Sequence, residues 1–83
     1  MKVLYFAWVR ETVGTSEEEI EQTDAMGTVG ALVASLKQKD NVYATVFADD
    51  AMVRAAVNQE YVNLDHPLSN SDEVAFFPPV TGG

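Results

Sequence analysis

The first apolar segment of the chain has the composition and alternation of a β-strand. Residues 2–9 read Lys-Val-Leu-Tyr-Phe-Ala-Trp-Val, a run rich in β-branched and aromatic side chains and too short for a stable isolated helix. Alternation gives it two faces, one with Val3, Tyr5, Ala7 and Val9 and the other with Leu4, Phe6 and Trp8. Because both faces are apolar, we expect a central strand that packs on a helix and turns its other side to a second layer or a partner.

The rest of the chain contains further short segments with strand character. Residues 10–16 include Gly14 and are expected to form a loop, and the polar segment 17–23 is a weak strand that would pair with the first as a hairpin. The run Glu17-Glu18-Glu19 is typical of a solvated sheet edge. Three later segments complete the strand prediction: 53–58 and 61–63, which flank a tight turn, and 73–77.

One segment has the period of an amphipathic helix. Its apolar residues are Val29, Leu32, Val33 and Leu36, at i, i+3, i+4 and i+7. Thr28 is a suitable N-cap, and lysines 37 and 39 would lie in the last turn, where cations complement the helix dipole. Asp40-Asn41 follows as a stop signal, and residues 41–47 are compatible with either a short helix or an irregular segment.

The order of these segments predicts an α+β fold with a single core. Eighty-three residues do not divide into two hydrophobic cores, and the chain has no internal repeat or linker. A hairpin, a helix that crosses the sheet and later strands that return beside the first is the order of the β-grasp, or ubiquitin-like, fold. We therefore expect a mixed sheet packed on one main helix in residues 1–77, followed by an extended tail in residues 78–83.

Charge and composition exclude several classes of partner. The chain has 13 acidic and 5 basic side chains and a formal charge of −8, which repels nucleic acids and anionic membrane surfaces. A basic protein surface would attract it, although acidity also serves solubility alone. Because the chain has no cysteine, it forms neither a disulfide nor a thiolate metal site. Without a signal peptide or a long apolar run, the sequence predicts a soluble, cytoplasmic protein.

Side chains suited to catalysis are scarce. His66 is the only histidine, and as it precedes a proline we interpret it as a turn residue, so that neither a catalytic triad nor a metal site is predicted. Arg10 and Arg54 are candidates for contact with a carboxylate or phosphate, because a guanidinium binds either in bidentate fashion. The alternative for both arginines is a plain surface charge.

The C-terminal segment contains the most informative chemistry. Pro78 and Pro79 cannot donate ladder hydrogen bonds, so the last strand should end at about Phe77 and continue as a stiffened arm. The four residues after Pro79 would reach on the order of 13 Å at about 3.3 Å each. Glycines 82 and 83 have no Cβ and would fit a narrow channel. The terminal carboxylate is a poor acyl donor, but once activated as a mixed anhydride with AMP it could accept sulfur and become a thiocarboxylate. A frayed end or a cloning scar is the alternative interpretation.

The sequence resembles the family of molybdopterin synthase small subunits over nearly its whole length. The matching segments are Lys2-Val3-Leu4-Tyr5-Phe6-Ala7, Val9-Arg10-Glu11 with Val13-Gly14, Ala55-Ala56-Val57-Asn58-Gln59, Asp65-His66-Pro67-Leu68, and Asp72 through Phe76-Phe77-Pro78-Pro79-Val80-Thr81-Gly82-Gly83. The terminal motif is the specific part, whereas the helix and residues 41–52 are less distinctive.

The resemblance implies a β-grasp sulfur carrier. In that family an ATP-dependent activating enzyme adenylates the terminal glycine, and sulfur transfer then gives a C-terminal thiocarboxylate. The tail enters the active site of the large subunit, where two such sulfurs convert cyclic pyranopterin monophosphate into molybdopterin. The assembly is a heterotetramer with two small subunits flanking a large-subunit dimer, so this chain would be a sulfur donor with no bound cofactor and no catalytic side chain of its own.

Applied to this sequence, the resemblance assigns roles to individual residues. Gly83 would carry the sulfur and Gly82 would provide clearance, while Val80 and Thr81 line the channel. Strand alternation adds an apolar docking patch of Phe6, Tyr61 and Phe77, used in turn by the activating enzyme and the synthase, with Val3, Tyr5, Val74 and Phe76 facing the helix. The other expected partner-binding residues are Arg10, Pro78 and Pro79.

Three alternatives to this function remain at the sequence level. A carrier that donates sulfur for the thiazole of thiamine has the same fold and Gly-Gly end, but resembles residues 76–81 less. A protein modifier would join Gly83 to lysines of target proteins by an isopeptide bond. A pure interaction domain would tolerate additional residues after Gly83, which a sulfur carrier would not.

Overall fold

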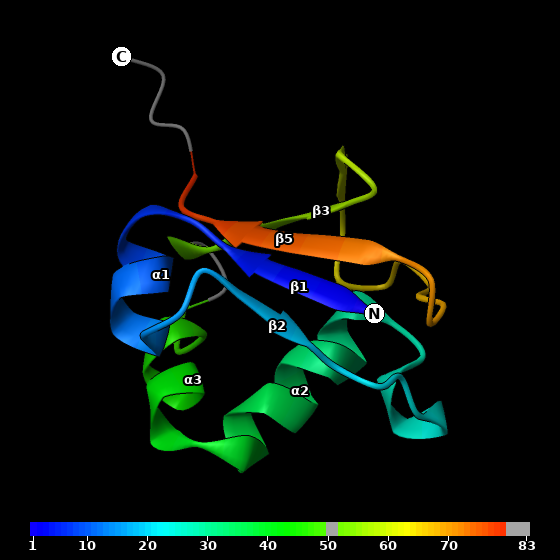
Figure 1. Ribbon diagram of the computed structural model, residues 1–83, viewed down its shortest axis with the longest axis horizontal. Helices are drawn as coiled ribbons and strands as arrows, with labels where there is room; N and C mark the ends of the chain where they lie inside the picture. Colours follow the sequence, from blue (N-terminus) through cyan, green and yellow to red (C-terminus); the bar gives the residue numbers. More distant parts are fainter. Residues whose placement is uncertain (50–51, 80–83) are drawn as a thin grey trace.

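The computed structural model of the chain, which describes residues 1–49 and 52–79, contains one five-stranded sheet with helices on one side (Figure 1). The strands are β1 (Lys2–Tyr5), β2 (Glu17–Glu19), β3 (Arg54–Val57), β4 (Glu60–Val62) and β5 (Glu73–Phe77). The helices are α1 (Ala7–Val13), α2 (Val29–Lys39) and α3 (Asn41–Val46), and Asp24–Met26 forms a single 3₁₀ turn.

The sheet is mixed, in the order β2-β1-β5-β3-β4. β1 pairs antiparallel with β2 and parallel with β5, so the first and last strands of the chain lie side by side at the centre (Figure 1). β3 and β4 form a hairpin closed by Asn58 and Gln59, which both have positive φ, as a two-residue type I′ turn requires. This α+β topology confirms the β-grasp fold that the order of the segments predicts.

The predicted main helix begins and ends close to where its pattern indicated. The Thr28 side chain accepts a hydrogen bond of 3.1 Å from the N–H of Ala31, which confirms its role as the N-cap. All four residues of the apolar stripe are buried: Val29, Leu32, Val33 and Leu36. Asp40 ends α2 and also caps α3 through the N–H of Val42, so residues 41–46 adopt the helical alternative.

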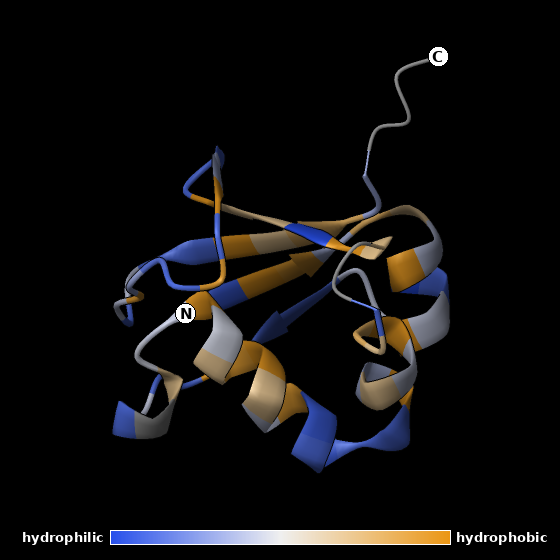
Figure 2. Cartoon of the chain, turned by 180° about the vertical axis from the view of Figure 1, so that it is seen from behind, coloured by the Kyte–Doolittle hydropathy of each residue, from blue (hydrophilic) through white to orange (hydrophobic). Residues whose placement is uncertain are grey.

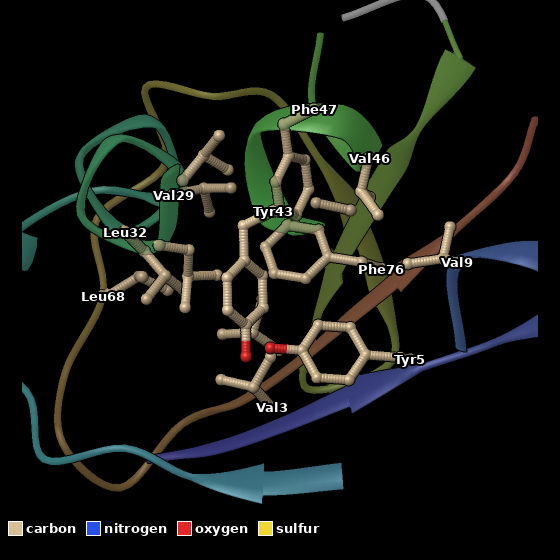
Figure 3. Packing of buried hydrophobic residues seen from close by; sticks show 14 of the residues in the cluster. Val3, Tyr5, Val9, Val29, Leu32, Tyr43, Val46, Phe47, Leu68 and Phe76 are labelled. Carbon is tan, nitrogen blue, oxygen red and sulfur yellow. The ribbon is translucent and has the colours of Figure 1, made fainter. Parts of the chain in front are cut away.

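The core fills the space between the sheet and the helices (Figure 3). Val3 and Tyr5 of β1 and Val74 and Phe76 of β5 are at most 1% exposed, which confirms that they face the helices. The Phe76 ring lies between two other aromatic rings, with centroids 6.3 Å from Tyr5 and 4.9 Å from Phe47. Figure 2 shows α2 and α3 on the same side of the sheet, and their buried residues, which include Leu32, Leu36 and Tyr43, belong to this core.

The prediction of a strand through residue 9 and a loop over residues 10–16 is wrong. The N–H of Phe6 donates the last hydrogen bond at this end of β1, to the carbonyl of Phe76, and the chain then leaves the sheet. Ala7 has a φ of 54°, a turn out of the strand direction, and opens α1. Gly14, with φ 95°, ends the helix and donates a 2.9 Å hydrogen bond to the carbonyl of Arg10.

This correction changes the surroundings of two predicted side chains. Trp8 packs against the helix side of the core, not on the outer face with Leu4 and Phe6. Ala7 is exposed, not turned towards the core, whereas Val9 is the buried residue of α1. β2 also ends at Glu19, so only the first part of segment 17–23 is a strand.

Candidate functional site

The sheet face opposite the helices carries a line of apolar side chains. Register pairs Leu4 with Ala75, Ala75 with Ala56 and Ala56 with Tyr61, across four neighbouring strands. Because residues in register share a face, these side chains lie on the side away from the buried core. No described element covers this face within residues 1–49 and 52–79 (Figure 1).

Two of the predicted patch residues are in contact at one end of this face. Tyr61 is 79% exposed. The centroid of its ring lies 5.4 Å from the centroid of the Phe77 ring, and the two ring planes are inclined by 37°. Phe77 is the last residue of β5 and pairs with Arg54 of β3. The structure therefore places an aromatic pair, an exposed Tyr61 and a partly buried Phe77, at the strand end that precedes Pro78.

Phe6, the third predicted patch residue, lies beside the end of the same strand. Its backbone N–H donates a 3.1 Å hydrogen bond to the carbonyl of Phe76, and its side chain is 47% exposed. Among the described residues its ring is in no ring contact with Tyr61 or Phe77. Phe6 thus borders the tyrosine and phenylalanine pair from the β1 side without stacking on it.

The prolines continue from this patch, and a shallow groove opens beside them. Pro78 and Pro79 are both partly buried. The groove has a volume of about 360 Å³, and Arg54, Tyr61, Asn63, Phe77 and Pro79 are among its lining residues. The predicted tail residues Val80, Thr81, Gly82 and Gly83 lie outside the described residues.

The two candidate arginines lie on different elements. Arg10 is exposed on α1, and Arg54 is exposed on β3 beside Phe77. The ion pairs found in the described part of the chain involve the Met1 amine, Lys2 and Lys39, and neither arginine. The sequence indicated Arg54 as a candidate for contact with an anion. Its position beside Tyr61 and Phe77 follows only from the register of β3, β4 and β5.

His66 has the turn role that the sequence predicts. Its N–H donates to the carbonyl of Asn63, and its own carbonyl accepts from the N–H of Val29 at the start of α2. Over residues 1–49 and 52–79, no three His, Cys, Asp or Glu side chains are grouped as metal ligands. No described helix is long and apolar enough to cross a membrane.

Glu18 is a hydrogen-bonded acid on the helix side of the sheet that was not predicted from the sequence. Glu18 accepts from the Tyr5 hydroxyl at 2.8 Å and from the Tyr43 hydroxyl at 2.5 and 2.8 Å, with the Lys39 amine at 3.4 Å. Strand alternation within Glu17-Glu18-Glu19 could have indicated this position, because the side chain of the middle residue points to the face opposite that of its two neighbours. Glu18 joins β2 to α3 on the inner side of the sheet, opposite the patch.

This cluster shifts the acidity of its members. Burial raises the pKa of Glu18, but the hydrogen bonds from Tyr43 and Tyr5 and the charge of Lys39 outweigh burial and lower it overall. Burial, with the Glu18 carboxylate, raises the pKa of Tyr43 to about 12 and raises that of Tyr5 further. At neutral pH the cluster is therefore one carboxylate held by two neutral phenols.

Known proteins resemble the chain over its full length. A family model described as the ThiS family matches residues 3–83. The molybdopterin synthase sulfur carrier subunit of Escherichia coli is 48% identical over 83 residues, covering 100% of this chain and 99% of that protein. Small archaeal modifier protein 3 of Haloferax volcanii is 33% identical over 91 residues, covering 100% of this chain and 98% of that protein. The crystal structure of SAMP1 from Haloferax volcanii has a TM-score of 0.79 at 30% identity, covering 100% and 98% of the two chains.

Proposed function

The chain belongs to the ThiS family, and on that premise we propose that it is the sulfur carrier subunit of a molybdopterin synthase. The observation that carries this proposal is the 48% identity to the Escherichia coli subunit of that name, which extends over the whole of both chains. The apolar patch supports it, because the exposed ring of Tyr61 contacts the partly buried ring of Phe77 just before the C-terminal segment in sequence.

The chemistry of the proposal takes place at the Gly83 carboxylate. An activating enzyme joins this carboxylate to the α-phosphate of ATP and releases pyrophosphate, which leaves an acyl adenylate. A sulfur nucleophile at the oxidation level of hydrosulfide then attacks the acyl carbon and AMP leaves, which gives the thiocarboxylate. In the active site of the synthase this sulfur bonds to cyclic pyranopterin monophosphate, and water cleaves the bond between the sulfur and the acyl carbon, which regenerates the carboxylate. No metal or cofactor bound to this chain takes part.

In this scheme the folded part of the chain docks on the partner protein and positions the C-terminal segment. Phe6, Tyr61 and Phe77 dock on the large subunit, and Pro78 and Pro79 direct the segment from Val80 to Gly83 into its active site. Stiffness matters here, because the two prolines restrict the backbone in advance and so reduce the conformational entropy lost on binding. The full assembly is a heterotetramer in the cytoplasm, with Arg10 at the edge of the contact.

Intact mass spectrometry tests the proposal. The chain is incubated with ATP, a sulfur donor and the activating enzyme of its host, and the expected product has one oxygen replaced by sulfur at Gly83. A variant with one alanine added after Gly83 is the matched control and should stay unmodified while it remains folded. If the chain gains no sulfur while an established carrier does so in parallel, the proposal is wrong.

A protein modifier is the second candidate, favoured by the 33% identity to small archaeal modifier protein 3. Activated Gly83 would then form isopeptide bonds with lysines of target proteins. Immunoblots of host cells under denaturing conditions distinguish the two functions. A ladder of covalent conjugates that requires Gly83 indicates a modifier, whereas free chain alone in active cells indicates a carrier.

A further inference from the structure

Arg54 is an exposed basic side chain on the surface of a strongly acidic chain. The molecule has 5 basic and 13 acidic side chains, and two of the five, Lys2 and Lys39, form ion pairs with acids of β2. Arg54 forms no ion pair in the described part of the chain, and it is exposed at the edge of the groove. Within residues 1–49 and 52–79, no carboxylate forms an ion pair with its guanidinium.

The groove beside Arg54 is continuous with the docking patch. Tyr61 and Phe77 belong to the patch and line the groove, and Pro79 lines it at the root of the tail. Arg54 is the register partner of Phe77 in the sheet, which puts the guanidinium stem next to that ring. A protein that receives the tail and covers the aromatic pair therefore comes within reach of Arg54.

Charge decides which group fits this position. The surface as a whole repels acidic partners, so a carboxylate approaches favourably only where a local cation outweighs the net charge of −8. Arg54 offers a planar fork that binds a carboxylate through two parallel hydrogen bonds. Once the aromatic pair is covered, water is excluded from the groove and that bond strengthens.

We propose that Arg54 is a specificity residue of the docking surface, which binds a carboxylate side chain of the synthase large subunit in the groove bounded by Tyr61, Phe77 and Pro79. This inference rests on the proposed function and adds the chemistry of the partner: an acidic side chain next to an apolar one that covers the aromatic pair. The ion pair fixes how the carrier is rotated on the large subunit, because the apolar contact by itself has no direction.

Affinity measurements with matched charge changes test the proposal. Binding of the full chain to the large subunit is measured for the wild type, Arg54→Gln, Arg54→Glu and Lys37→Glu. Lys37 is exposed in the last turn of α2, in the helix layer, so its reversal changes the net charge by the same amount as Arg54→Glu. We expect Arg54→Gln to weaken binding about tenfold and Arg54→Glu more, with Lys37→Glu within about twofold of the wild type.

Chemical cross-linking identifies the contacted group. The Arg54→Lys variant carries an amine at this position, which a carbodiimide joins to a carboxylate in direct contact. We expect a cross-linked peptide between position 54 and one Asp or Glu of the large subunit, and none from Lys37. That acid, changed to Lys in the large subunit, should restore binding of Arg54→Glu.

The outcomes separate the inference from the proposed function. If the wild type binds the large subunit and Arg54→Gln binds equally well, the inference is overturned and the function stands. An equal loss for Arg54→Glu and Lys37→Glu also overturns it, because net charge then accounts for the effect. A loss seen only with the activating enzyme contradicts the assignment to the large subunit. If the wild type does not bind the large subunit, both proposals fail.

Discussion

Tyr61 is a residue whose proposed role lies in binding and not in the stability of the fold. Tyr61 is 79% exposed and touches Phe77 on the uncovered face of the sheet, so removing its ring takes little from the core. Exposed aromatic side chains of this kind contribute much of the energy at protein interfaces, because they bury a large area with few rotatable bonds.

We therefore expect Tyr61→Ala to weaken binding to both the large subunit and the activating enzyme by about tenfold or more. The free energy of unfolding should change by less than about 0.5 kcal/mol. Calorimetric titration and urea unfolding measure the two effects, with Met52→Ala, at a residue 49% exposed and outside the patch, as the control. Unchanged affinity for both proteins would show that the patch is not a docking surface.

Glu18 has the opposite role, since it serves the fold and lies away from the patch. Its folded-state pKa is lowered by the two tyrosine hydrogen bonds, so its contribution to stability is present above the ordinary pKa of 4.5. That contribution is lost as the pH falls through the lowered pKa, when the carboxylate binds a proton and the tyrosines lose a charged acceptor.

Glu18→Gln is expected to destabilise the chain at neutral pH and to flatten the loss of stability below about pH 4.5. Urea unfolding at a series of pH values from neutral to acid measures this difference. Glu21→Gln, an exposed acid outside β2, is the control and should retain the steep acid dependence of the wild type. Identical slopes for all three proteins would rule out Glu18 as the source.

Among the elements, α2 is the one whose bounds depend most on local signals. Thr28 satisfies the free N–H of Ala31, and the apolar stripe then recurs at helical spacing against the sheet. Each of these buried side chains contributes about 1.5–3 kcal/mol relative to exposure. The helix begins where the cap is and ends where Asp40 starts a new cap.

Thr28→Ala is expected to lower the free energy of unfolding by about 1 kcal/mol, because one helix N–H loses its acceptor. Thr28→Ser keeps the hydroxyl and should stay within a few tenths of a kcal/mol of the wild type. Urea denaturation monitored by far-ultraviolet circular dichroism compares the three proteins. Equal stability of the alanine and serine variants would contradict the capping role.

α1 shows where local signals failed. The run 7–9 is apolar and short, so strand and helix periods fit it equally well, and the decision depends on where β1 loses its partner. β5 ends at Phe77, and the chain turns at Ala7 to pack α1 against α3. Gly14 was a local clue, since a glycine directly after an apolar i, i+4 pair, here Val9 and Val13, is typical of a helix end.

At the scale of the whole molecule, the net charge of −8 sets how the chain meets its partners. A field of this sign accelerates approach to a basic surface and is screened by salt over a Debye length of about 8–10 Å at physiological ionic strength. In the proposed function, charge therefore acts on the encounter, whereas the patch and the tail would act on the bound complex.

We expect the association rate constant with the large subunit to fall about tenfold or more as salt rises from low to well above physiological concentration. The dissociation rate constant should change much less, because the apolar contact is not screened. Stopped-flow fluorescence of Trp8 or of an attached dye measures both constants. An association rate that is independent of salt would show that net charge plays no part.

Local sequence was sufficient for the features that depend on neighbouring residues. Alternation determined which side chains of β1 and β5 enter the core, helical spacing and a threonine cap determined α2, and the residue types of the tail pointed to its chemistry. Tertiary structure decided the end of β1, the Glu18 cluster and the place of Arg54 beside Phe77 and Tyr61. The physical reason is that strand register joins segments far apart in the chain, and no local period encodes which residues it brings into contact.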